Sequence, residues 1–199
     1  MVKRGLFSVT NKTGLEKFAR LATAGWEIIS TGGTAKTLGE ASIPVTPIEQ
    51  VTGFPEMLDG RLKTIHPNVF GGILAIRDNL GHMEIITKHG IKPIDLIVVN
   101  LYDFLGKPDI EQIDIGGPSL IRAAAKNGIS TIPLVDPNDY DWVIDELVRT
   151  GDISEDKHEH LVMKVFECTT SYDKQISEWM RQEREAGRRF LRPAAKTAH

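Results

Sequence analysis

Two short polar segments of the sequence combine hydroxyl groups, a lysine and the start of a predicted helix. The first covers residues 8–13 (SVTNKT) and overlaps the end of a predicted strand at 5–9; the second covers residues 30–36 (STGGTAK) and follows a predicted strand at 26–30. Unpaired N–H groups at a helix start can hold a phosphate, and the two glycines allow a close approach. Threonine and glycine also serve as ordinary cap and turn residues. Because two such segments follow neighbouring strands, the sequence favours a phosphate site.

Four further residues have the chemistry to move protons. Lys63 lies in a basic segment, residues 60–67 (GRLKTIHP), whose glycine and proline indicate a loop, although a solvated basic loop would have the same pattern. Tyr102 follows a nearly continuous apolar run at 94–100, and Asp114 precedes a glycine pair at a predicted helix start, where the helix dipole favours a carboxylate. Lys126 stands near the end of that helix, where a lysine alone is better explained as offsetting the negative pole. Together the four make a plausible acid/base set.

The elements that must position these residues alternate between strand and helix. Strands are predicted at 5–9, 26–30, 94–100 and 130–135, and a helix is predicted at 13–24, with Thr13 and Glu16 as a capping box and Gly25 as its end. A second helix starts at Asp136-Pro137. This alternation predicts a three-layer α/β/α sandwich with a mostly parallel sheet. The residues expected to face the core are Leu15, Phe18, Ala19 and Ala22 in the first helix and Tyr140, Val143, Ile144, Leu147 and Val148 in the second.

A long helix is predicted from residue 154 to about 187, because no glycine or proline interrupts the segment before Gly187. Val165, Thr169, Tyr172, Ile176 and Trp179 form a narrow seam at helical spacing. The seam either packs on the chain's own core or forms a helix–helix contact with a second subunit. We therefore divide the chain into an α/β domain at 1–153 and a C-terminal helical extension at 154–199.

Composition excludes several classes of protein. The 199 residues carry 24 Lys+Arg and 27 Asp+Glu, and this balance lacks the basic excess of a nucleic-acid binder. Cys168 is the single cysteine, so an intrachain disulfide and a Cys-rich zinc site are excluded, and the histidines show no metal-ligand spacing. No apolar run reaches the length of a membrane span. We expect a cytoplasmic protein without a metal, a nucleic-acid partner or a membrane partner.

Five segments in order resemble the inosine monophosphate cyclohydrolase domain of the bifunctional purine-biosynthesis enzymes. They are residues 7–15 (FSVTNKTGL), 30–36 (STGGTAK), 52–67 (TGFPEMLDGRLKTIHP), 99–102 (VNLY) and 111–127 (EQIDIGGPSLIRAAAKN). The resemblance implies a methylglyoxal-synthase-like fold, no cofactor and a homodimer. It also implies the dehydrative closure of 5-formamidoimidazole-4-carboxamide ribonucleotide to inosine monophosphate.

The resemblance also implies a place for each site residue. The 5′-phosphate end of the substrate would be lined by Thr10, Asn11, Lys12, Thr31, Gly32, Gly33 and Thr34. The base end would be lined by Arg61, Lys63, Thr64, Asn100, Leu101, Asp114 and Ile115. Lys126 matches the family's proton-transferring lysine, and Tyr102 is a candidate proton donor. If Lys63 and Lys126 lie close together, each lowers the pKa of the other, which favours a neutral amine. In the alternative, Asp114 holds one of the lysines protonated to stabilise an oxyanion.

The sequence departs from the family's pattern in two ways, and two alternative functions share the expected fold. Asp103 stands where relatives commonly have proline, and family chains usually continue into a formyltransferase domain, so we expect a stand-alone or shortened cyclohydrolase without transferase activity. The alternatives are a methylglyoxal-synthase-like lyase acting on dihydroxyacetone phosphate and a regulatory module that binds a phosphate or nucleotide. The lysines and Asp114 favour the cyclohydrolase, because a regulatory module does not need them.

Overall fold

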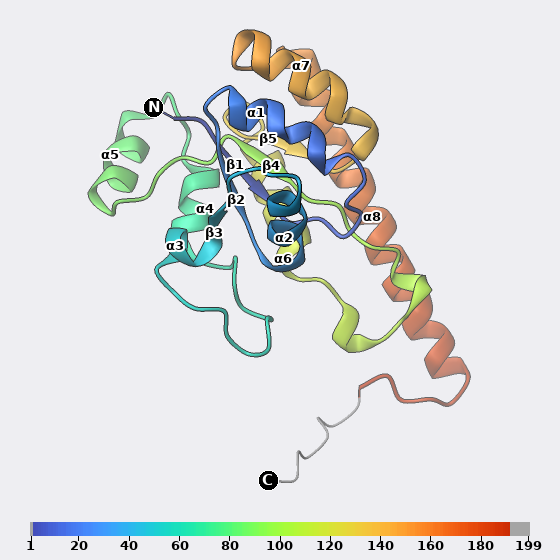
Figure 1. The fold of residues 1–199 in the computed structure, drawn as a ribbon. Coiled ribbons are helices and arrows are strands. Elements are labelled where there is room, and N and C mark those ends of the chain that lie inside the picture. The colour runs from blue at the N-terminus through green and yellow to red at the C-terminus, as the bar shows by residue number, and fades with distance from the viewer. Residues whose placement is uncertain (1, 192–199) are drawn as a thin grey trace.

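A five-stranded parallel sheet forms the centre of the computed structural model, which describes residues 2–191 (Figure 1). The strand order is β3-β2-β1-β4-β5. The strands are β1 (Arg4–Phe7), β2 (Glu27–Ser30), β3 (Thr46–Pro47), β4 (Leu96–Val98) and β5 (Ile132–Leu134). All neighbouring strands pair in parallel, so the predicted α/β class is confirmed. The chain enters the sheet at its central strand, β1.

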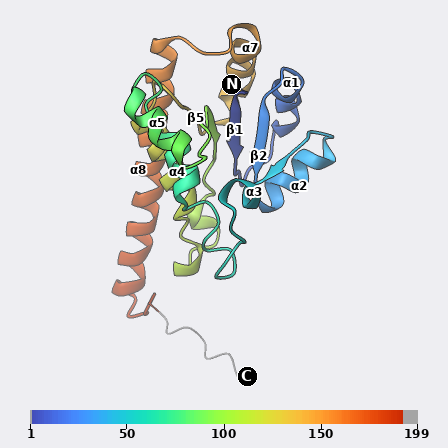
Figure 2. The same cartoon turned by 90° about the vertical axis from the view of Figure 1, so that its left-hand side faces the viewer.

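Helices cover both faces of the sheet, as Figure 2 shows with α1 and α2 on one side and α4 and α8 on the other. The helices are α1 (Ala19–Thr23), α2 (Gly32–Glu40), α3 (Ile48–Thr52), α4 (Pro67–Leu74), α5 (Leu80–Lys88), α6 (Gly116–Lys126), α7 (Tyr140–Thr150) and α8 (Glu155–Glu185). Short 3₁₀ turns are η1 (Leu15–Phe18), η2 (Phe104–Gly106), η3 (Ile110–Gln112) and η4 (Pro137–Asp139). Among residues 2–191, no helix combines the length and apolar character that crossing a membrane requires.

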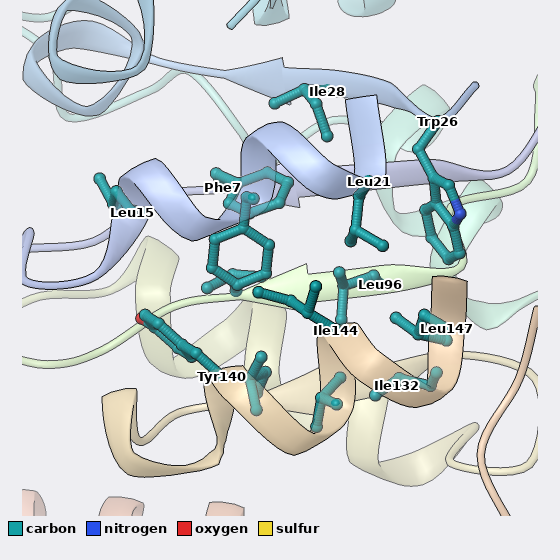
Figure 3. Packing of buried hydrophobic residues seen from close by; sticks show 14 of the residues in the cluster. Phe7, Leu15, Leu21, Trp26, Ile28, Leu96, Ile132, Tyr140, Ile144 and Leu147 are labelled. Atoms are coloured by element: carbon teal, nitrogen blue, oxygen red, sulfur yellow. The ribbon is translucent and has the colours of Figure 1, made fainter. Parts of the chain in front are cut away.

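Successive residues of the strands contribute side chains to two hydrophobic cores, one on each face of the sheet. Phe7 and Ile28 point into the core beneath α1 and α7, while Leu6 and Ile29 point into the core beneath α4 and α6. Figure 3 shows the first core, in which Tyr140 of α7 faces the strands. Because side chains on a strand alternate between its two faces, this pattern produces the predicted three layers.

The first predicted helix is correct in place but wrong in its cap. Gly14 adopts φ 79°, so the chain enters a 3₁₀ turn at Leu15 and no side chain caps it. The predicted capping box of Thr13 and Glu16 is therefore wrong, because the left-handed glycine separates Thr13 from the first turn. The helix end is confirmed, since Gly25 adopts φ 87°. Of the predicted core face, Leu15 and Phe18 are buried, and Ala19 and Ala22 pack against the same core.

The helix predicted to start at Asp136-Pro137 is confirmed. The Asp136 carboxylate accepts a hydrogen bond from the Asn138 N–H at 2.9 Å, and Pro137 occupies the first position of η4, which leads into α7. The expected burial of Val148 is wrong, because its side chain is 42% exposed at the edge of the α7 contact face.

The long C-terminal helix is confirmed as α8, and its seam is buried within the chain. Val165 packs in the core beneath α6, and Tyr172, Ile176 and Trp179 surround Phe104 in a separate cluster. The seam therefore does not supply a free surface for a second subunit. The homodimer stays a prediction, as does the division at residue 153. Residues 192–199 of the predicted extension lie outside the described residues.

Candidate active site

A cavity of about 640 Å³ lies at the carboxyl ends of the strands. Its walls come from the ends of β1 and β2 and from two segments near residues 59–65 and 110–117. Strand order reverses between β1 and β4, and ligands of open parallel sheets bind at such a switch point. The predicted site residues that line the cavity are Thr31, Arg61, Lys63, Thr64, Asp114 and Ile115.

Two buried polar side chains fix the loop that follows β1. The Asn100 amide oxygen accepts hydrogen bonds from the N–H groups of Thr10 (2.8 Å) and Asn11 (2.9 Å), and its NH₂ donates to the Asn11 carbonyl. The Thr34 hydroxyl accepts from the Val9 N–H at 3.1 Å and donates to the Val9 carbonyl. Asn100 and Thr34 therefore fix the conformation of this loop through hydrogen bonds to its main chain. Neither side chain lines the cavity.

The same loop brings Lys12 to the glycines of the second polar segment. A Cβ on Gly33 would lie 3.8 Å from the Lys12 Nζ, so the lysine lies over the start of α2. Gly32 takes φ 47°, a conformation that favours glycine. Thr10, Asn11, Lys12, Gly32 and Gly33 are exposed. The structure thus places a lysine, hydroxyl groups and a helix N-terminus together, which suits a phosphate.

The basic cluster at 60–67 lies in a loop, as predicted, and carboxylates neutralise it. Residues 58–60 all have positive φ, and an antiparallel bridge joins Met57 to Leu62. Lys63 pairs with Glu56 at 2.9 Å, and Arg61 pairs with Glu111 across the cavity. An anionic ligand would compete with these carboxylates for both cations.

Asp114 is held at the N-terminus of α6 by several main-chain contacts. Its carboxylate accepts a hydrogen bond from the Gly117 N–H at 3.0 Å, and its own N–H donates to the Tyr172 hydroxyl at 2.8 Å. Burial raises the pKa of Asp114, and the N–H groups of Gly117 and Gly116 oppose that rise. A carboxylate with a raised pKa is suited to accepting a proton near neutral pH.

The glycine pair is needed for the close packing around this carboxylate. A Cβ on Gly117 would lie 2.4 Å from Asp114 Oδ2 and 3.0 Å from a Leu101 methyl group. A Cβ on Gly116 would lie 3.2 Å from the hydroxyl of Thr64, which is buried. Asp114, Leu101 and Thr64 therefore meet at the start of α6.

Tyr102 lies behind Asp114 against α8. Its ring meets the Tyr172 ring edge-to-face, with centroids 6.2 Å apart. Burial, followed by a hydrogen bond to Tyr172, raises the pKa of Tyr102 well above its usual range. Tyr102 therefore stays protonated and able to donate.

Lys126, like Lys12 and Tyr102, is a predicted site residue that does not line the cavity. It is exposed in the last turn of α6, ten residues beyond Gly116, which corresponds to about 15 Å along the helix axis. Lys63 lies near the other end of this helix, next to Thr64, so the two lysines are separated along α6, and the proton-transfer role of Lys126 stays a prediction. The cavity lies at the N-terminal end of α6, whereas Lys126 lies at its C-terminal end, where a lysine offsets the negative pole of the helix dipole.

Several lining or supporting residues were not predicted from the sequence as parts of the site. They are Ser8, Glu56, Asp59, Gly60, Ile65, Ile110, Glu111, Ile113, Gly116, Gly117 and Tyr172. Most flank a predicted residue by one to three positions, and that proximity was the available signal. Tyr172 had no such signal, because it lies 58 residues from the group that it binds. Within residues 2–191, no group of three or more His, Cys, Asp or Glu side chains is arranged to hold a metal ion.

The sequence of this chain is similar to the sequences of purine-biosynthesis proteins. A family model described as MGS-like domain matches residues 14–132, and one described as AICARFT/IMPCHase bienzyme matches residues 124–198. The bifunctional purine biosynthesis protein PurH of Clostridium acetobutylicum is 50% identical over 192 residues, covering 92% of this chain and 38% of that protein. PurH of Streptococcus mutans is 50% identical over 189 residues, covering 90% and 37%. The chain thus spans under two fifths of the length of these relatives.

A solved structure has a similar fold. The crystal structure of ForH superimposes with a TM-score of 0.82 at 33% sequence identity, covering 89% of this chain and 98% of that one.

Proposed function

Because the chain belongs to the MGS-like domain family and its relatives are purine-biosynthesis proteins, we propose that it closes the purine ring as an inosine monophosphate cyclohydrolase. The observation that carries the proposal is the partly buried carboxylate of Asp114, which shares one cavity with Lys63 and Thr64. The cavity volume lies within the usual range for small-molecule sites.

The substrate of this proposal is 5-formamidoimidazole-4-carboxamide ribonucleotide, held at its two ends. Its 5′-phosphate would bind at Lys12 and the start of α2, where the helix dipole favours an anion. Its carboxamide and formyl groups would then lie between Lys63 and Asp114. Holding both ends of one molecule supplies much of the acceleration, because the reacting groups are already connected.

Ring closure needs two proton transfers during the attack and two more during the loss of water. The carboxamide nitrogen attacks the formyl carbon and forms a C–N bond, and its proton passes to Asp114. The formyl oxygen gains negative charge, which the Lys63 ammonium stabilises before it donates a proton. Protonated Asp114 then returns its proton to the resulting hydroxyl, which leaves as water, and the neutral Lys63 amine takes the formamide N–H proton as the C=N bond forms. Both side chains return to their starting states. Tyr102, kept protonated by its surroundings, is a further donor near Asp114.

The direct experiment follows inosine monophosphate formation by ultraviolet absorbance after the protein is mixed with the formylated ribonucleotide. Asp114→Asn should lower kcat by about 10²–10⁴, the usual contribution of a positioned acid or base. Asp103→Asn is the matched control, because Asp103 uses its carboxylate to cap η2 by accepting from the Leu105 N–H.

Three outcomes would contradict the proposal. A wild-type protein that binds inosine monophosphate without turning over the ribonucleotide would favour the regulatory module. Conversion of dihydroxyacetone phosphate to methylglyoxal would favour the lyase. Equal loss of activity in the two aspartate variants would remove the specific role of Asp114.

A further inference from the structure

The second half of α8 forms a platform beneath the two loops that lead to the cavity. Tyr172, Ile176 and Trp179 pack around Phe104, which is fully buried. The partly buried side chains that pack against this cluster include Leu101, Ile110 and Ile113, which flank Tyr102 and Asp114. The segments that carry Tyr102 and Asp114 therefore both pack against the same part of α8.

Tyr172 is the polar member of this platform that reaches the site. Its side chain is 3% exposed, and its hydroxyl accepts the hydrogen bond from the Asp114 N–H at 2.8 Å. Its ring meets Tyr102 and Phe104 edge-to-face, each at 6.2 Å between centroids. The ring is thus fixed by packing, and the hydroxyl is fixed at the main chain of Asp114.

We propose that Tyr172 is a positioning residue for the ring-closing reaction, fixing Asp114 through its main-chain N–H and Tyr102 through the contact between their rings. This inference rests on the proposed function. It assigns to α8 a part in the reaction, although α8 lies beyond residues 14–132 that match the MGS-like domain.

A purely structural role would require only the ring. Phenylalanine would keep both edge-to-face contacts and fill the same space. It would leave the partly buried Asp114 N–H without its acceptor and would also remove the hydrogen bond between Tyr102 and Tyr172. A partly buried donor without an acceptor is unfavourable. The loop would then relax to pair that N–H elsewhere, and the carboxylate would move from its position opposite Gly117. Catalytic groups tolerate little displacement, because the rate depends on their alignment.

Tyr172→Phe separates these roles. We expect kcat for ring closure to fall about 10–100-fold with KM changed less than about threefold, because the phosphate contacts lie elsewhere. Ile176→Val is the matched control, since it trims the same platform one turn away without touching a polar group, and it should keep the wild-type kcat. In the ligand-free protein, hydrogen exchange of the Asp114 amide should be at least about tenfold faster in Tyr172→Phe than in wild type.

A wild-type kcat in Tyr172→Phe, or an equal fall in Ile176→Val, would overturn the inference. If the wild-type protein shows no ring closure, the proposed function fails first. The exchange rate of the Asp114 amide then decides the positioning role alone, and an unchanged rate in Tyr172→Phe would overturn it.

Discussion

Replacing Gly117 by alanine tests whether Asp114 must lie where the structure places it. The new Cβ would stand 2.4 Å from Asp114 Oδ2 and 3.0 Å from a Leu101 methyl group, whereas ordinary contacts are 3.4–4 Å. The carboxylate must therefore move by about 1 Å, because the glycine lies in the first turn of α6 and its backbone is held by the helix.

The size of the effect follows from the contacts that are lost. Moving the carboxylate weakens its hydrogen bond from the Gly117 N–H, and a bond to a charged group contributes about 1.5–3 kcal/mol. Alanine favours the helix over glycine by about 0.5–1 kcal/mol, which offsets part of that loss. We expect a net fall of about 1–2 kcal/mol in the free energy of unfolding. A displacement near 1 Å should lower kcat about 10²-fold.

The assay combines urea unfolding with the absorbance assay for ring closure. Gly39→Ala is the control, because Gly39 lies in α2 with nothing within 4 Å of the added Cβ, so alanine should raise stability and leave kcat unchanged. Wild-type kcat in Gly117→Ala would refute the reasoning. It would mean that Asp114 tolerates displacement and does not handle a proton.

Four further predictions follow from the site. Lys63→Ala should lower kcat by about 10²–10⁴, whereas Lys126→Ala should cost about 0.3–1 kcal/mol of stability and keep kcat; the opposite order would return proton transfer to Lys126. Lys12→Ala should raise KM with a smaller effect on kcat, and a kcat loss at unchanged KM would contradict its phosphate role. Because burial raises the pKa of Asp114, the native state binds this proton more readily than the unfolded state, so wild-type stability should fall relative to Asp114→Asn as pH rises through the raised pKa. Urea titrations should show the two proteins converging below about pH 3.5, and a relative gain by wild type at neutral pH would contradict the sign. Turnover should survive exhaustive chelation, because ring closure needs proton transfers alone, and a loss restored by a divalent cation would disprove this.

The sheet and the cavity loops were predictable because their signals are local. Runs such as residues 94–100 are apolar on both faces, as a strand in the middle of a parallel sheet requires, and β4 is fully buried. Asp114 before Gly116 and Gly117 showed where α6 begins. Ligands of open parallel sheets bind at the carboxyl ends of the strands, which predicted that these residues lie together at that edge of the sheet. The cavity lies there.

Other features depend on contacts between distant parts of the chain. Arg61 and Glu111 are 50 residues apart, and their pairing depends on how two loops pack, which periodicity does not describe. The capping box failed because one backbone angle, at Gly14, outweighed a favourable side-chain spacing. Lys126 lies in the last turn of α6, ten residues from the cavity end of the helix, and spacing along a sequence does not show this separation.

The central position of β1 has a consequence for synthesis on the ribosome. β1 pairs with β2 on one edge and with β4 on the other, and Val98, the partner of Phe7, follows it by roughly 90 residues. At about 5–20 residues per second, one edge of the first strand stays open for about 5–20 s. During that interval the nascent chain exposes an apolar strand edge of the kind that recruits chaperones or pairs wrongly. The loop that follows β1 also lacks its hydrogen bonds to Asn100 until that residue emerges, so the phosphate site cannot be completed before then.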